Sequence, residues 1–212
     1  MESKKAKKEA IRKQIISAAG VYKSELAGKV FLYVYGREYF EIVFKVESFM
    51  HLTGVDSNLY AKQFYNYSKA GKLTNNQFYF SDKHPFAGAK EKLSCLVKLP
   101  LLTNSLVCVL KDMATVTLTY KIGVTNLDFT LGLTENIDAE GNKINDMYLP
   151  RTLRIKDDSI AKSKDGDFVD FILMRDASVS SYDTIMYKDE KKKLPETVQH
   201  LISPELYDML KA

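Results

Sequence analysis

One histidine in the chain stands in a segment of unusual composition, Phe49-Met50-His51-Leu52-Thr53-Gly54. A histidine side chain has an unperturbed pKa of about 6.5, so its imidazole can give or take a proton at neutral pH. The segment interrupts a strand-like run, and loop ends are where site residues concentrate. His51 is therefore a candidate acid or base. The alternative is a histidine at a helix start that hydrogen-bonds its own turn, with Gly54 serving backbone geometry.

A second candidate segment is Tyr148-Leu149-Pro150-Arg151-Thr152-Leu153-Arg154. In a regular strand, Arg151 and Leu153 would share one face, and Thr152 and Arg154 the other. The proline indicates an edge strand or a bulge. An arginine offers a fork of donors that suits a phosphate, and the threonine adds a hydroxyl. The alternative is a solvated strand face.

A third candidate is the run Lys90-Glu91-Lys92, on a predicted helix that follows His84-Pro85. Either lysine could reach a phosphate, whereas the alternative is a pair of solvated lysines on the helix surface. We interpret His84, directly before a proline, as a loop histidine.

The positive charge of the chain is concentrated at its beginning. Six basic and two acidic side chains occupy residues 1–13, which accounts for the whole net charge of +4, and the remaining residues are balanced. Lys4, Lys5, Lys7 and Lys8 could contact phosphates of a nucleic acid as a basic amphipathic arm. The alternative is a solvated helix end.

Several functional classes lack their sequence signatures. No run reaches the roughly 18 apolar residues that a membrane span requires, and the basic N-terminus does not lead into an apolar signal core. We therefore expect a cytoplasmic protein that does not enter a membrane. Cys95 and Cys108 lie in apolar sequence, which predicts buried free thiols in a reducing compartment. Two cysteines and three histidines, widely separated, show no zinc spacing, and no phosphate loop is present, so we expect neither metal nor cofactor.

The hydrophobic pattern predicts helices first and strands later. Apolar residues at helical spacing predict helices over residues 3–27, 58–69, 85–102 and 204–210. Runs rich in β-branched and aromatic residues predict a β-hairpin formed by residues 30–35 and 39–46. Alternating residues predict strands over 105–111, 115–122 and 127–133, a polar turn follows over 136–145, and further strands are predicted over 147–155, 168–174 and 184–188.

This order predicts an α+β fold in which N-terminal helices pack on a mainly antiparallel β-sheet. We expect a single domain over residues 1–212. Within it, residues 1–27 form a basic N-terminal helix, residues 28–190 form the α+β core, and residues 191–212 form a C-terminal tail helix.

The order of these features resembles a known family. The histidine block, a Phe64-Tyr65 helix, a helix with Lys92-Leu93, and a late strand with Pro150-Arg151-Thr152 together resemble the phage-associated branch of the barnase/EndoU/colicin/RelE-like nuclease superfamily, in its fourth subtype. The resemblance covers about residues 20–190.

The resemblance implies a metal-independent ribonuclease carried by phages or mobile elements. His51 matches the family histidine, and Arg151 matches the basic residue of the late strand. Thr152 stands where serine is commoner, which keeps a hydroxyl, and Lys92 stands where a basic residue is usual. Together with these four catalytic candidates, we expect Arg154 and the N-terminal lysines to contact nucleic acid.

Metal-free RNA cleavage requires a base, an acid and cations for the developing phosphorane charge. His51 could be the base or the acid, Arg151 and Lys92 could hold the phosphate, and Thr152 could donate to a non-bridging oxygen. The second acid/base group stays open between His84, Tyr148 and a lysine. The leading hypothesis is therefore an endoribonuclease acting on RNA, such as tRNA, in the cytoplasm of a phage host.

The alternative is a non-catalytic phage protein that binds a host protein partner and inhibits a defence or nucleic-acid-processing machine, as anti-CRISPR proteins do. It is motivated by the balanced charge of the body, since RNA enzymes usually show a stronger basic footprint. Nothing in the residue pattern indicates an oligomeric state.

Overall fold

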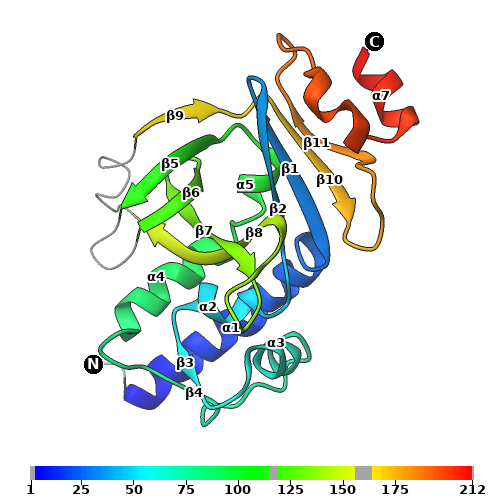
Figure 1. Cartoon of the computed structure of the whole chain (residues 1–212). Coiled ribbons are helices and arrows are strands. Elements are labelled where there is room, and N and C mark those ends of the chain that lie inside the picture. The colour runs from blue at the N-terminus through cyan, green and yellow to red at the C-terminus, as the bar shows by residue number, and fades with distance from the viewer. Residues whose placement is uncertain (1–2, 115–118, 156–163, 212) are drawn as a thin grey trace.

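The computed structural model of the chain describes residues 3–114, 119–155 and 164–211. In these residues, helices pack against a large sheet of nine strands, which confirms the expected α+β class (Figure 1). All neighbouring strands are antiparallel except β2 and β8, which pair in parallel through Ile42 and Tyr148.

The strands of the large sheet follow one another in space in an order that differs from their order in the chain. This spatial order is β11 (Thr184–Lys188), β10 (Phe171–Asp176), β1 (Lys29–Tyr35), β2 (Glu38–Val43), β8 (Lys143–Ile155), β7 (Phe129–Ile137), β6 (Thr119–Thr125), β5 (Cys108–Ala114) and β9 (Lys164–Phe168). A separate antiparallel ribbon joins β3 (Asp56–Ser57) to β4 (Phe78–Tyr79).

Strand β1 is buried on both of its faces, which explains its continuous apolar sequence. Because successive side chains of a strand point to opposite faces, β1 contributes to two separate hydrophobic clusters. Phe31, Tyr33 and Tyr35 join the main core, whereas Val30, Leu32 and Val34 join the second cluster. The sheet is therefore covered on both sides at this strand.

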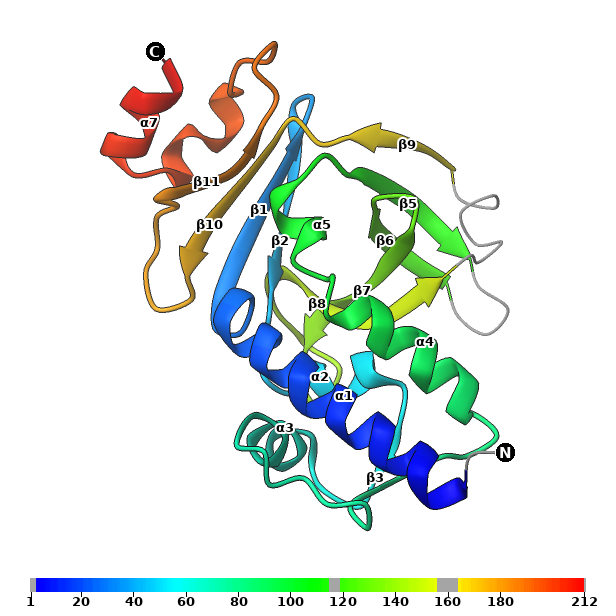
Figure 2. The ribbon, with the colours of Figure 1, turned by 180° about the vertical axis from the view of Figure 1, so that it is seen from behind.

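The helices form two groups on the two faces. Among the described residues, five helices contribute buried side chains to the main core: α1 (Lys4–Glu25), α2 (Ser48–Thr53), α3 (Ala61–Lys69), α4 (Phe86–Leu96) and α5 (Leu101–Asn104). The second cluster is covered by the short 3-10 helix η1 (Glu196–Leu201) and by α7 (Pro204–Lys211). Figure 2 shows α1 running along one end of the sheet beside α2 and α4, while α7 lies at the opposite end.

Helix α1 forms where the apolar spacing predicts it. Ser3 caps its start by accepting a hydrogen bond from the Ala6 backbone N–H at 3.2 Å. Its buried face consists of Ile11, Ile15, Ala18, Ala19 and Tyr22. The Tyr22 hydroxyl donates to the Lys45 carbonyl at 2.8 Å, which fixes the segment entering α2 against α1.

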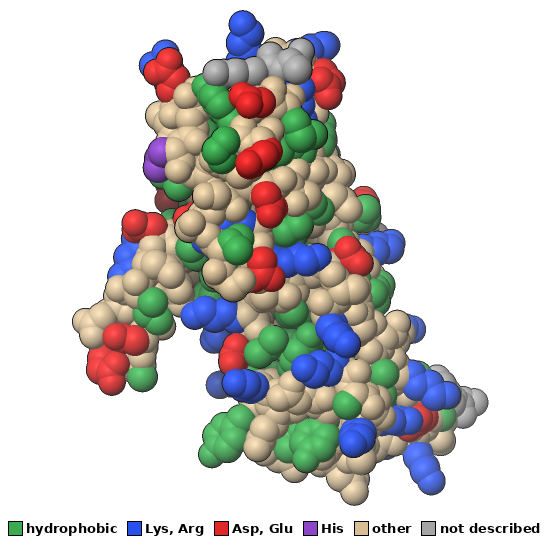
Figure 3. Space-filling model, turned by 90° about the vertical axis from the view of Figure 1, so that its right-hand side faces the viewer, with side chains coloured by type: hydrophobic (Ala, Val, Ile, Leu, Met, Phe, Trp, Pro, Cys, Tyr) green, Lys and Arg blue, Asp and Glu red, His purple; other side chains and the backbone are tan. Residues whose placement is uncertain are grey.

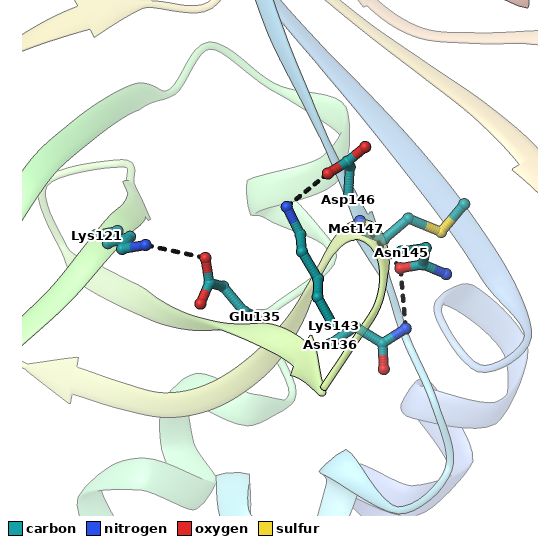
Figure 4. A network of polar contacts seen from close by, with 7 residues as sticks. All are labelled: Lys121, Glu135, Asn136, Lys143, Asn145, Asp146 and Met147. Carbon is teal, nitrogen blue, oxygen red and sulfur yellow. Dashed lines mark hydrogen bonds and ion pairs between the residues drawn. The ribbon is translucent and has the colours of Figure 1, made fainter. Parts of the chain in front are cut away.

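A polar network ties the β7–β8 hairpin to the same segment, and Figure 4 shows the part of this network that lies within the hairpin. The Asn136 side chain is 2% exposed, and its Oδ1 accepts from Lys45 Nζ at 2.8 Å. Its Nδ2 donates to Asn145 Oδ1 at 3.0 Å, and the Met147 backbone N–H donates to the same oxygen at 3.1 Å. The network joins the entry of α2 to the hairpin from which β8 continues.

The expected elements agree with most of the structure. The predicted helix 85–102 is instead two helices, because α4 ends at Leu96 and α5 (Leu101–Asn104) begins after Pro100. The polar turn predicted over 136–145 is a hairpin tip, with Ile137 paired to Lys143. Helices α2 and η1 and strands β3 and β9 were not predicted, and residues 115–118 of one predicted strand lie outside the described residues.

Cys95 and Cys108 are free thiols, as expected. Cys95 is buried and Cys108 is half-buried, and this burial raises the pKa of both thiols. In the part of the chain that the structure describes, no helix has the length and apolar character needed to cross a membrane.

Candidate active site

His51 lies in the last turn of α2, with its ring at the protein surface. The helix buries Phe49 and Leu52 and ends at Gly54, whose φ of 71° is left-handed. The Thr53 hydroxyl donates to the Met50 carbonyl at 2.7 Å and helps close this turn. The expectation of a histidine at a helix start is therefore wrong, because His51 stands at the C-terminal end of a short helix.

The side chain of Lys92, on α4, passes over the end of α2 at Gly54. A Cβ atom placed on Gly54 would lie 2.7 Å from Lys92 Cδ and 3.4 Å from Ala89 Cα. The residue must therefore be glycine for two reasons, the positive φ and the close approach of α4. The lysine stem is held beside the turn that carries His51.

Arg151 occupies a bulge in β8. Pro150 pairs with Leu133 and Thr152 pairs with Gly132, so Arg151 is an extra residue that faces no partner on β7. Its side chain is exposed, whereas Leu153 is only 1% exposed. Arg151 nevertheless reaches α2, whose Phe49 and Leu52 belong to the same main core as Leu153. The bulge that Pro150 suggested is confirmed.

The bulge brings Arg151 to His51. Arg151 Nη1 lies 3.2 Å from His51 Nε2. A guanidinium can only donate, so this nitrogen of His51 must accept and the ring proton resides on Nδ1. Partial burial lowers the pKa of His51, and the charges of Arg151, His84 and Lys92 lower it further. The site therefore favours a neutral imidazole at neutral pH.

Lys92 and Arg154 add positive charge beside this pair. Burial lowers the pKa of Lys92, and the neighbouring charge of Arg154 lowers it further. Arg154 is half-buried on β8, three residues beyond Arg151. Thr152 is 6% exposed between these arginines, so its hydroxyl is largely withdrawn from solvent.

A second histidine belongs to the same region. His84 Nδ1 lies 2.7 Å from Asp56 Oδ1, and Ser81 Oγ donates to the other carboxylate oxygen. Burial alone would raise the pKa of Asp56, but these hydrogen bonds outweigh it and the pKa lies below its ordinary value. His84 is close enough to His51 for its charge to contribute to the lowered pKa there.

The basic beginning of α1 lies next to the segment that follows His84. Lys7 Nζ lies 5.8 Å from the centroid of the Phe86 ring, and Lys8 Nζ lies 5.1 Å from that of Phe78. Lys4 and Lys5 are exposed in the first turn of α1. Figure 3 shows Lys and Arg side chains gathered over the lower part of one face, whereas Asp and Glu predominate in its upper part.

The sequence-predicted residues thus lie in two adjoining groups. His51, Lys92 and Arg151 meet around the end of α2, with Arg154 beside Lys92 and Thr152 buried next to Arg151. Lys4, Lys5, Lys7 and Lys8 lie farther along, beyond His84 and Phe86. Asp56 and Ser81 were missed, because their pairing with His84 depends on the short β3–β4 ribbon, which has no recognisable sequence pattern.

In the described ranges, no three His, Cys, Asp or Glu side chains are grouped so that they could hold a metal ion. Histidine, lysine and arginine predominate where His51 and Arg151 meet. This donor set suits an anion such as a phosphodiester.

A comparison with protein families gives one match over most of the chain. Residues 14–191 match the model of the family described as phage-Barnase-EndoU-ColicinE5/D-RelE like nuclease4. The comparison with curated proteins gives no significant match, and the comparison with solved structures gives none either. The matched range contains His51, Lys92, Arg151 and Arg154, whereas Lys4, Lys5, Lys7 and Lys8 lie before it.

Proposed function

The chain belongs to the family of phage-Barnase-EndoU-ColicinE5/D-RelE like nucleases of the fourth type, and on this premise we propose that it cleaves RNA by general acid/base chemistry at His51. The single observation that carries the proposal is the contact of Arg151 with the Nε2 atom of His51. This contact supports the proposal because it brings an imidazole and a guanidinium within hydrogen-bonding distance at the protein surface.

His51 acts as the base that accepts the proton of the 2′-hydroxyl. Its lowered pKa favours the neutral ring, and the lone pair needed for proton transfer is on Nε2. Before substrate binds, Arg151 occupies that lone pair. A bound phosphate draws the guanidinium toward its own oxygens and thereby releases Nε2 for the reaction.

Arg151 and Lys92 hold the reacting phosphate. Arg151 is exposed on its bulge and free to turn its fork of donors to the non-bridging oxygens. The Lys92 stem passes over Gly54, and its charge is near enough to contribute to the lowered pKa of His51. Two cations at this point stabilise the extra negative charge that develops on the phosphorane. Thr152 supplies the hydroxyl next to Arg151, although it is mostly buried.

Beyond the reacting phosphate, the bound RNA continues toward α1. Lys4, Lys5, Lys7 and Lys8 stand beyond the His84 segment, and phosphate contacts of this kind supply affinity without reading sequence. RNA binding of this kind depends on local charge, because residues 14–212 are electrically balanced. RNA in the host cytoplasm, such as tRNA, is the substrate class we assign.

The proposal is tested by incubating the purified protein with a mixed RNA pool in the presence of a chelator. The wild type should cleave RNA, and His51→Ala and Arg151→Ala should each lose at least about a hundredfold in rate. Lys90→Ala, on the exposed side of the same helix as Lys92, should cleave like the wild type.

Two outcomes would remove the assignment. Variants at His51 and Arg151 that cleave as fast as the wild type would show that the site is elsewhere. Intact RNA with the wild type, together with a stoichiometric host protein on co-purification, would favour the non-catalytic inhibitor instead.

A further inference from the structure

We propose that His84, oriented by Asp56 and Ser81, is the general acid that protonates the leaving 5′-oxygen. The inference rests on the proposed function and adds the second proton-transfer group to the same site. It starts from the hydrogen bond between His84 Nδ1 and Asp56 Oδ1 at 2.7 Å.

The arrangement around His84 is built from several short-range constraints. Asp56 on β3 pairs with Tyr79 on β4, and Ser81 follows two residues later. Ser81 and His84 exchange backbone hydrogen bonds of 3.1 Å in both directions, and the His84 N–H also reaches Ser81 Oγ at 3.2 Å. The turn from Ser81 to His84 is therefore closed on itself, and Ser81 links it to the carboxylate.

This geometry leaves one imidazole nitrogen for a substrate. Asp56 accepts from Nδ1, and among the described residues Nε2 has no hydrogen-bond partner. The His84 side chain is 41% exposed, while that of Asp56 is 26% exposed. A carboxylate at Nδ1 fixes the orientation of the ring, and Nε2 is then the nitrogen that gives its proton to the substrate in the proposed step.

The two histidines have opposite surroundings, and this separates their roles. His51 receives a hydrogen bond from a cation, which favours its neutral form, whereas His84 contacts a carboxylate through Nδ1. Pairs of titratable groups in contrasting environments are how one site supplies both a base and an acid at neutral pH.

In the resulting reaction each histidine transfers one proton. His51 Nε2 takes the proton of the 2′-hydroxyl as its oxygen forms a bond to phosphorus. The bond from phosphorus to the 5′-oxygen breaks, and that oxygen takes the proton from His84 Nε2. The products are a 2′,3′-cyclic phosphate and a 5′-hydroxyl, with His51 protonated and His84 neutral.

The test uses an oligoribonucleotide that the wild type cleaves at a known bond, and a second version in which sulfur replaces the 5′-bridging oxygen of that bond. A thiolate leaves without protonation, so the sulfur version makes a general acid dispensable. His84→Ala should lower cleavage of the oxygen version by about a hundredfold or more. It should lower cleavage of the sulfur version less than about tenfold, whereas His51→Ala should lower both.

Asp56→Asn tests the positioning role of the carboxylate. It should show the same difference between the two substrates as His84→Ala, but to a smaller extent. Asp82→Asn removes a neighbouring exposed carboxylate as a matched control and should change neither rate. Thermal unfolding of each variant establishes that the protein is folded.

A His84→Ala variant that loses both substrates equally, or neither, would overturn the inference while leaving His51 as the base. Failure of the wild type to cleave the oxygen version of any RNA would remove the proposed function, and this inference with it.

Discussion

Arg151 Nη1 lies 3.2 Å from His51 Nε2, and because a guanidinium has no acceptor, His51 must be neutral in this contact. Two segments a hundred residues apart supply the pair: the last turn of a six-residue helix and a bulge in a long strand. The contact therefore favours the neutral form of His51 before any substrate is present.

The first prediction concerns the titration of His51. Burial and the charges of Arg151, His84 and Lys92 lower its pKa, so NMR titration should give a midpoint below about 6.5. Arg151→Ala and Lys92→Met each remove a positive charge, so the midpoint should rise in both variants. The acidic limb of kcat/KM should move to higher pH in the same direction.

Lys90→Met is the matched control, since it removes an exposed lysine from the same helix. It should leave the midpoint unchanged. A wild-type midpoint at or above the ordinary histidine value, or one insensitive to Arg151→Ala, would contradict the electrostatic account.

The second prediction separates backbone strain from crowding at Gly54. Gly54→Ala and Gly71→Ala both place a side chain at positive φ, of 71° and 69°, and each should lose about 1–2 kcal/mol of unfolding free energy. At Gly71 nothing lies within 4 Å of the added Cβ, whereas at Gly54 it meets Lys92.

Gly54→Ala should therefore be the less stable variant in chemical denaturation, and it alone should lower the rate of RNA cleavage, by displacing Lys92. Equal activity of the two variants would show that the position of Lys92 over Gly54 does not matter for the reaction.

The third prediction concerns the basic start of α1. Lys4→Gln/Lys5→Gln, made in a His51→Ala background to prevent cleavage, should bind RNA more weakly. The slope of log affinity against log salt should become shallower by up to about two, one for each lost phosphate contact. Fluorescence anisotropy over a salt series measures both quantities.

Lys191→Gln/Lys193→Gln makes the same charge change at exposed lysines near the other end of the chain. This control should bind like the parent. If the two pairs behave alike, net charge and not the α1 arm determines the affinity.

The fourth prediction concerns the hairpin network. Asn136→Leu removes the acceptor of Lys45 Nζ and the donor to Asn145 Oδ1 within a buried position. The unfolding free energy should fall by about 1–3 kcal/mol. Asn142→Ala, at the exposed tip of the same hairpin, should change the unfolding free energy by less than about 0.5 kcal/mol. Similar losses in denaturant titrations would show that the buried amide is not the important link.

Much of the fold follows from local patterns. Apolar residues at helical spacing predict the helix over residues 3–27, and runs rich in β-branched and aromatic residues predict the hairpin over residues 30–46. The structure has α1, β1 and β2 there. Strand β9 escaped prediction because its sequence, Lys164–Phe168, lacks an apolar alternation. Its place in the sheet comes from pairing with β5.

The site was accessible to sequence reasoning only in part. His51, Lys92 and Arg151 stand in segments whose residue types suit phosphate chemistry, so they could be selected without a structure. Their meeting could not be derived, because it depends on a bulge that adds one residue to β8. Asp56 is an ordinary acidic residue until the β3–β4 ribbon brings it to His84, 28 residues away.

The chemical ends of the RNA products test the central claim most directly. Wild-type protein incubated with RNA in the presence of a chelator should give fragments with 2′,3′-cyclic phosphate and 5′-hydroxyl ends, identified by mass spectrometry, and His51→Ala should give none. Fragments with 3′-hydroxyl and 5′-phosphate ends, or cleavage that persists in His51→Ala, would contradict a reaction in which His51 activates the 2′-hydroxyl.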